Sequence, residues 1–199
     1  MLHLPQTTDI NRALPKTVLY ERFKLRSGQQ AHFDEDISRM VLVNCIDAET
    51  VPALQVGQKV ASIYVLQVLL KRKNYDPKNI EMLFKLIPQR MVLALQHGVE
   101  VQMATFEGLL VTSPWQNKEA AKLTLRGIDL DDVWSALVAQ VGNVVVEEGK
   151  TVREQLEDNA RHDALQKKIE ALEKKARAER QPHRKMELFE EIQKLKKTK

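Results

Sequence analysis

The chain has 199 residues, of which 43% are hydrophobic, and this composition is sufficient for one packed domain and an appendage. The single cysteine, Cys45, excludes an internal disulfide and a cysteine-rich zinc site, and we expect it to be a buried structural thiol. Because the sequence shows neither a signal-peptide pattern nor a run of about 18 apolar residues, we expect a cytoplasmic protein with no membrane contact.

The net charge of +4 is unevenly distributed. Residues 1–150 contain 17 basic and 17 acidic side chains, and residues 151–179 contain 7 of each sign. The whole excess lies in residues 180–199, which contain 7 basic and 3 acidic side chains. Charge asymmetry of this kind is typical of an interacting terminus.

The first part of the chain carries weak structural signals. We expect a partly helical lead-in, with Pro15 in the first turn of a helix that continues through Phe23. Residues 27–30 are predicted to form a turn. The polar residues 33–36 are expected to cap a short helix that runs through Ile37.

Two apolar, β-branched runs predict the first strands of a sheet. Residues 40–46 are typical of a buried strand, and residues 60–70 give the strongest strand signal, which we expect at the centre of the sheet. Asp76 and Pro77 then suit the N-cap and first position of an amphipathic helix, which Pro88 ends.

Three further segments are predicted to form a β-meander. They are residues 91–96, 99–106 and 109–112. After them, apolar residues at helical spacing over 130–141 predict a helix capped by Asp129 or Asp131. The sequence therefore predicts an α+β domain over residues 1–150, with a mixed or antiparallel sheet and helices packed on it.

Residues 151–199 contain no glycine and a single proline, Pro182, so their composition differs from that of the domain. Apolar residues in this arm follow the alternating spacing of four and three that marks a coiled-coil or helix-pair seam. The seam residues are Leu165, Ile169, Leu172, Leu188, Ile192 and Leu195. Because Pro182 should break the helix, the arm is either an antiparallel hairpin or one kinked helix. An apolar seam must be buried, so the arm is a candidate contact for a protein partner or a second copy of the chain.

The sequence contains no motif of a catalytic, cofactor-binding or metal site, so we expect no cofactor and no catalytic activity. A restriction-type nuclease carries an acid two residues before a lysine on a central strand, but Leu69 occupies that position before Lys71. Asp34, Glu35 and Asp36 are the remaining acidic candidates. A divergent metal-dependent nuclease stays an alternative that requires these carboxylates to converge with Lys71.

Two basic clusters provide candidate contacts for nucleic acid or for a partner. The first is Lys71, Arg72 and Lys73, after the expected central strand. The second contains Arg180, Arg184, Lys185, Lys194, Lys196, Lys197 and Lys199. Such side chains neutralise phosphates and give affinity without reading a base sequence. A nucleic-acid-binding module that uses the basic end of the chain is therefore a further alternative.

Several separated stretches of the chain also form a recognisable set. They are residues 14–23, Leu70-Lys71, residues 87–93, 113–115, 179–188 and 191–195. Together they resemble an uncharacterised bacterial family, the domain of unknown function 4391. The most distinctive stretch is Arg180-Gln181-Pro182 with Arg184-Lys185, and the resemblance covers nearly the whole chain.

This resemblance implies a partner class but no catalytic residue. Genes of this family often stand beside the DNA methyltransferase and helicase genes of restriction-like defence systems. The resemblance therefore implies that this protein is an accessory component of such a system. Together with the missing site motifs and the heptad-bearing arm, it leads us to expect a non-catalytic adaptor. We expect the α+β domain to dock on a larger protein, such as a helicase or a DNA methyltransferase, and the arm to supply a second contact.

Overall fold

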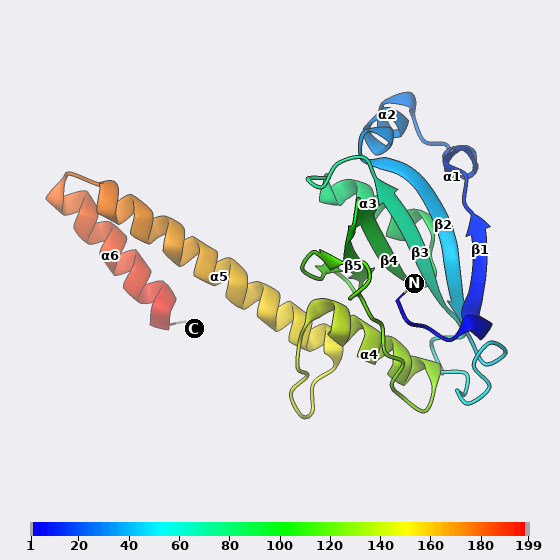
Figure 1. The fold of residues 1–199 in the computed structure, drawn as a ribbon. Coiled ribbons are helices and arrows are strands. Elements are labelled where there is room, and N and C mark those ends of the chain that lie inside the picture. The colour runs from blue at the N-terminus through cyan, green and yellow to red at the C-terminus, as the bar shows by residue number, and fades with distance from the viewer. Residues whose placement is uncertain (1, 198–199) are drawn as a thin grey trace. The chain divides into compact units, whose positions relative to one another are not determined.

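A computed structural model describes residues 2–197 of the chain (Figure 1). The chain divides into two compact units, one that ends at Val145 and one that begins at Val146, and each is described by itself. The first unit contains a mixed β-sheet with helices and the second consists of helices, which confirms the predicted fold class. Among the described helices, none combines the length and the apolar composition that crossing a membrane requires.

The sheet of the first unit has the strand order β1-β2-β3-β4-β5-β6, and β7 pairs with β5. The strands are β1 (Asp9–Ala13), β2 (Ile37–Ile46), β3 (Ile63–Leu70), β4 (Arg90–His97), β5 (Glu100–Phe106), β6 (Leu110–Thr112) and β7 (Gln116–Asn117). Strands β3 and β4 are parallel, and the other neighbouring pairs in the described chain are antiparallel. Strands β4, β5 and β6 form the predicted meander.

Helices surround this sheet and connect its strands. They are η1 (Gln6–Thr8), α1 (Lys16–Arg22), α2 (Ser27–Asp36), α3 (Pro77–Leu86) and α4 (Leu130–Gly142). Helix α3 is the crossover that makes β3 and β4 parallel. The predicted caps Asp76 and Asp129 each accept a hydrogen bond of 2.9 Å from a backbone N–H in the first turn. Asp131, the alternative cap, instead accepts hydrogen bonds from the backbone N–H groups of residues 58–60.

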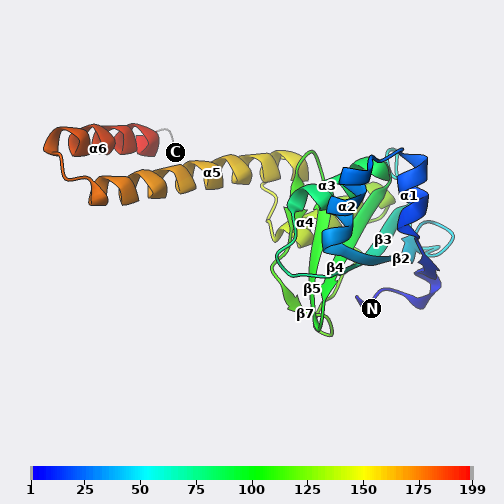
Figure 2. The same ribbon diagram turned by 90° about the horizontal axis from the view of Figure 1, so that it is seen from above.

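The core on one face of the sheet joins three helices to the parallel strands. Leu19 of α1, Phe33 of α2 and Leu83 of α3 are buried there. They pack in one cluster with Leu66 of β3 and Leu93 of β4, and Figure 2 shows the three helices on one side of the strands. Helix α4 packs against β5 and β6. Burial of these apolar side chains holds α2 and α3 against the same face of the sheet. The polar residues at the end of α2 and at the start of α3 are thereby brought close together.

Two predictions for the first part of the chain are wrong. Residues 27–30 form the first turn of α2 and not a loop, because the Gln29 side chain accepts a hydrogen bond from the Arg26 backbone N–H and the helix buries Phe33. The helix ends at Asp36, and Ile37 already belongs to β2. The lead-in also contains β1, an edge strand whose residues are all exposed, so no alternating apolar pattern marks it in the sequence.

The second unit contains α5 (Val152–Ala178) and α6 (Pro182–Lys197), separated by residues 179–181. Thr151 and Glu154 form a capping box, in which the Glu154 carboxylate accepts from the Thr151 backbone N–H at 2.8 Å. Pro182 occupies the first position of α6, where its missing N–H costs nothing. The two helices pack against each other, so the arm is an antiparallel hairpin and not one kinked helix.

Candidate functional site

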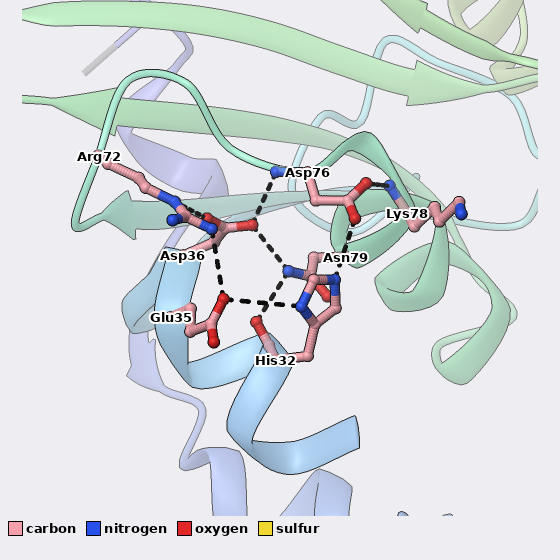
Figure 3. Close-up of polar contacts among 7 residues, drawn as sticks. All are labelled: His32, Glu35, Asp36, Arg72, Asp76, Lys78 and Asn79. Atoms are coloured by element: carbon pink, nitrogen blue, oxygen red, sulfur yellow. Dashed lines mark hydrogen bonds and ion pairs between the residues drawn. The ribbon is translucent and has the colours of Figure 1, made fainter. Parts of the chain in front are cut away.

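A cluster of polar side chains lies where β2 begins and β3 ends (Figure 3). We call it the strand-end cluster; its members are His32, Glu35, Asp36, Arg72, Asp76 and Asn79. Antiparallel pairing of Ile37 with Leu70 brings the acidic run 34–36 beside the basic run 71–73. These runs therefore converge, as the nuclease alternative requires, at the carboxyl end of two parallel strands, where α/β proteins commonly bind ligands.

Asp36 is the centre of this cluster, and its side chain is fully buried. One carboxylate oxygen accepts a hydrogen bond from Arg72 Nε. The other accepts from the Asp76 backbone N–H and from Asn79 Nδ2, each at 2.7 Å. Burial alone would raise the pKa of Asp36, but these three donors outweigh it and hold the pKa below its usual value. The carboxylate is thus ionised and already fully engaged by protein groups.

The remaining acids of the cluster are paired in a similar way. His32 lies between two carboxylates, with Nε2 at 3.0 Å from Asp76 Oδ2 and Nδ1 at 3.7 Å from Glu35 Oε2. Arg72 Nη2 lies 3.5 Å from the same Glu35 oxygen. The hydrogen bond from the Lys78 backbone N–H lowers the pKa of Asp76, and the contact with His32 lowers it further. Figure 3 shows these contacts as one continuous network of α2, α3 and the segment between β3 and α3.

Asp34 lies outside that network and connects α2 to α1. Its carboxylate accepts hydrogen bonds from Lys16 Nζ and from the Tyr20 hydroxyl, the latter at 2.8 Å. Burial opposes ionisation of Asp34, but Lys16 and Tyr20 together lower its pKa, and the charge of Lys71 adds to this effect. The pKa of Tyr20 is raised by its own burial and by the neighbouring carboxylate. This contact therefore holds α1 and α2 together.

The charged side chains in and around the strand-end cluster are mostly paired with one another, and this limits which ligands or reactions the cluster could support. Lys73 forms an ion pair with Glu100 at 2.6 Å and lies 5.2 Å from the ring centre of Trp115. Within residues 2–197, no three His, Cys, Asp or Glu side chains are placed to hold a metal ion. Cys45 is buried, and burial raises the pKa of its thiol to about 11. The arrangement favours a structural anchor over an active site, because its carboxylates already have cationic or hydrogen-bonding partners.

The predicted seam residues of the arm lie together in the hairpin. The cluster consists of Leu165, Ile169, Leu172 and Ala176 of α5 with Leu188, Ile192 and Leu195 of α6. Two ion pairs connect the helices beside it, Lys168 with Glu191 at 3.5 Å and Lys196 with Glu173 at 2.8 Å. The hairpin thus buries its apolar seam within one copy of the chain.

The basic residues around the helix break form a separate exposed group. We call Arg180, Arg184 and Lys185 the hairpin tip; none of the three forms an ion pair within the described part of the chain. Arg184 and Lys185 lie in the first turn of α6, where the helix dipole disfavours positive charge. The Gln181 backbone N–H lowers the pKa of the nearby Glu179, and the charge of Arg184 adds to this effect. Lys194 and Lys197 lie near the other end of α6, and Lys199 lies outside the described residues.

The comparison with protein families covers both units. A family model described as Domain of unknown function (DUF4391) matches residues 2–198. The chain belongs to this family. Because the match runs through the arm, the helical hairpin is part of the DUF4391 domain and not an unrelated extension. Searches of curated proteins and of solved structures returned no significant match.

Sequence analysis did not identify His32 and Asn79 of the strand-end cluster, or the neighbouring Lys16 and Tyr20, as functional candidates. Asn79 carried the clearest signal, because it lies four and seven residues before Leu83 and Leu86 on the buried face of α3. A polar residue at such a position requires a buried partner, which is Asp36. Lys16 and Tyr20 carried no comparable signal, because their contact with Asp34 depends on how α1 packs.

Proposed function

We propose that this chain is a non-catalytic accessory protein of a bacterial restriction-like defence or DNA-processing complex. In this proposal it binds a larger protein, such as a helicase or a DNA methyltransferase, and the hairpin supplies one of the contacts. The pairing of the carboxylates in the strand-end cluster supports a role without catalysis. The family resemblance supports the class of partner.

The observation that carries the proposal is that the hairpin buries its own apolar seam and leaves a basic tip exposed. The seam is closed internally, so the hairpin is a finished structural element that needs no second arm. Its tip nevertheless exposes Arg180, Arg184 and Lys185, which form no ion pair among the described residues, and two of them, Arg184 and Lys185, lie in the first turn of a helix. The helix dipole disfavours these two charges, and an acidic surface on a partner would complement the whole basic tip.

The test is co-purification of the full chain with the products of its neighbouring genes. Reversing the tip charges (Arg180→Glu, Arg184→Glu and Lys185→Glu together) should lower recovery of the partner by about tenfold or more. The matched control reverses Lys118, Lys122 and Arg126, three exposed basic residues of the first unit, and changes the net charge equally. Equal recovery with both triple variants, or no retained partner with the unaltered chain, would contradict the proposal.

A nucleic-acid-binding module is the second candidate, because the same exposed basic tip fits phosphate groups. Binding of a DNA duplex should then weaken steeply with salt, and the logarithmic slope should fall by about 2 to 3 when the three tip residues are reversed. The measurement is a fluorescence-anisotropy titration at several salt concentrations. An unchanged slope in the tip variant would exclude this candidate, while DNA binding by the purified chain alone would favour it over the adaptor.

A further inference from the structure

The first unit contains a pocket at the end of the sheet where the parallel strands β3 and β4 begin, opposite the strand-end cluster. Its volume is about 370 Å³, and it is lined by Ser62 before β3, Arg90 of β4 and Phe106 of β5. Phe84 of α3 and Trp134 of α4 also line it. The volume is near the lower end of the roughly 300–1,000 Å³ of ligand sites, so the pocket suits one small molecule.

Aromatic side chains form one wall of this pocket. The rings of Phe84 and Phe106 stack with their centres 5.9 Å apart, and both side chains are only partly buried. The Trp134 side chain is buried, and the Arg90 guanidinium lies 5.4 Å from its ring centre. Ring surface that stays open at a pocket favours a flat aromatic ligand, because such a ligand can stack on it.

The charged residues that line the pocket are Lys59 and Arg90, and no acidic residue appears in its described lining. The two neighbouring carboxylates are already engaged. Glu107 accepts hydrogen bonds from Arg90 Nη1 and Trp134 Nε1, each at 2.8 Å. Asp131 accepts from the backbone N–H groups of residues 58–60. An anion in the pocket therefore meets two cations and no free carboxylate.

The pocket also presents polar groups that the protein does not use. Within residues 2–197, the side chains of Lys59, Ser62 and Gln89 form no hydrogen bond or ion pair, and Arg90 engages only Nη1. The strand-end cluster differs, because its central carboxylate is fully engaged by protein groups. Open ring surface together with a few unused polar groups is the arrangement of a small-molecule site.

We propose that this pocket binds one nucleotide. The base stacks on the phenylalanine wall, the phosphate accepts hydrogen bonds from Lys59 and the free nitrogens of Arg90, and Ser62 and Gln89 contact the sugar or the base edge. Two cations favour a phosphate over a singly charged carboxylate. A free nucleoside monophosphate and the 5′ end of a single-stranded nucleic acid share this chemistry. The inference goes beyond the proposed function and does not depend on it.

The first experiment is a calorimetric titration of the full chain with each of the four common ribonucleoside monophosphates. At least one should bind with a Kd below about 1 mM. The corresponding nucleoside and inorganic phosphate should each bind at least about tenfold more weakly, because each keeps only part of the contacts. No binding of any monophosphate at about 2 mM, or a nucleoside that binds as tightly as its monophosphate, overturns the inference.

Two substitutions test the assigned contacts. Lys59→Ala should weaken binding about tenfold through loss of a phosphate contact, whereas Lys122→Ala, which removes an exposed lysine outside the pocket, should not. Phe84→Leu should weaken binding about fivefold or more, because it keeps an apolar side chain and removes the ring, and Phe23→Leu is its control. The exposed Lys59 side chain has no contact to lose in the fold, so an unchanged affinity in Lys59→Ala overturns the inference even if Phe84→Leu lowers stability.

The indole N–H signals of the two tryptophans locate the bound nucleotide in a ¹⁵N–¹H spectrum, and Trp115→Phe assigns them. The nucleotide should shift the signal of Trp134, which lines the pocket, and leave that of Trp115, which does not. A shift of the Trp115 signal alone, or of neither, overturns the inference.

The same spectrum distinguishes the two sources of the nucleotide. If a short 5′-phosphorylated oligothymidylate shifts the Trp134 signal at lower concentration than the monophosphate does, the ligand is the end of a nucleic acid. If only the monophosphate shifts it, the ligand is a free nucleotide, and either result supports the pocket. These measurements need no partner protein and do not involve the hairpin tip, so their failure leaves the proposed function untouched.

Discussion

The anchoring role assigned to Asp36 can be tested by Asp36→Asn, which keeps the shape of the side chain and replaces one acceptor oxygen by a donor. In the folded chain the carboxylate accepts from Arg72, from the Asp76 backbone N–H and from Asn79. At least one buried donor would lose its partner and face the new amide group. Discounting the bond to Arg72, whose side chain is 49% exposed, we expect the free energy of unfolding to fall by about 2–4 kcal/mol.

Urea unfolding followed by tryptophan fluorescence is a suitable assay. Both tryptophans of the chain, Trp115 and Trp134, lie in the first unit, so the signal reports that unit without a contribution from the hairpin. Glu35→Gln is the control, because Glu35 is 58% exposed and its contacts at 3.5 Å and 3.7 Å should contribute less than about 0.5 kcal/mol.

The pH dependence gives an independent check on the same residue. The pKa of Asp36 in the folded chain is below its usual value, so the carboxylate contributes stability that is fully present above the unfolded pKa of about 3.9. That contribution is lost as the pH falls through the lower, folded pKa. The difference in stability between the unaltered chain and Asp36→Asn should therefore narrow only below about pH 4. A difference under about 0.5 kcal/mol at pH 7, or one equal to that of Glu35→Gln, would refute the anchoring role.

Three further substitutions test other parts of the fold. Ile192→Ala should destabilise the hairpin by about 2–4 kcal/mol and lower the melting temperature of the helical circular-dichroism signal, whereas the exposed Gln193→Ala should not. Thr151→Ala should cost about 1 kcal/mol by removing the cap of α5, and amide exchange should increase in its first turn only. Trp134→Phe removes the hydrogen bond of 2.8 Å from Nε1 to Glu107, so urea unfolding should show a loss of about 1 kcal/mol.

The elements that could be predicted from the sequence are those whose local signal agrees with their environment. The strand predicted over residues 60–70 begins later, at Ile63, but its mostly apolar composition on both faces fits the position of β3 in the middle of the sheet. Helix α3 carries its cap, its first proline and its apolar face within one short segment. Strand β1 carries no such signal, because an exposed edge strand is defined by pairing with β2.

The strand-end cluster could be predicted only in part, for a related reason. The sequence shows two charged runs, but their approach depends on the register that pairs Ile37 with Leu70. Even with this register known, nothing in the sequence assigns Asp36 to the buried position and Glu35 to the exposed one. That assignment follows from the end of α2, where one residue faces α3 and its neighbour faces solvent.

The length of the seam explains why the arm closes on itself. Helix α5 has 27 residues and α6 has 16, which correspond to about 40 Å and 24 Å. The spacing that begins at Leu165 would continue backwards to His162 and Asp158, and both are polar. The apolar seam of α5 therefore extends only as far as α6 can cover it, whereas an arm built to pair with another long helix would continue the pattern.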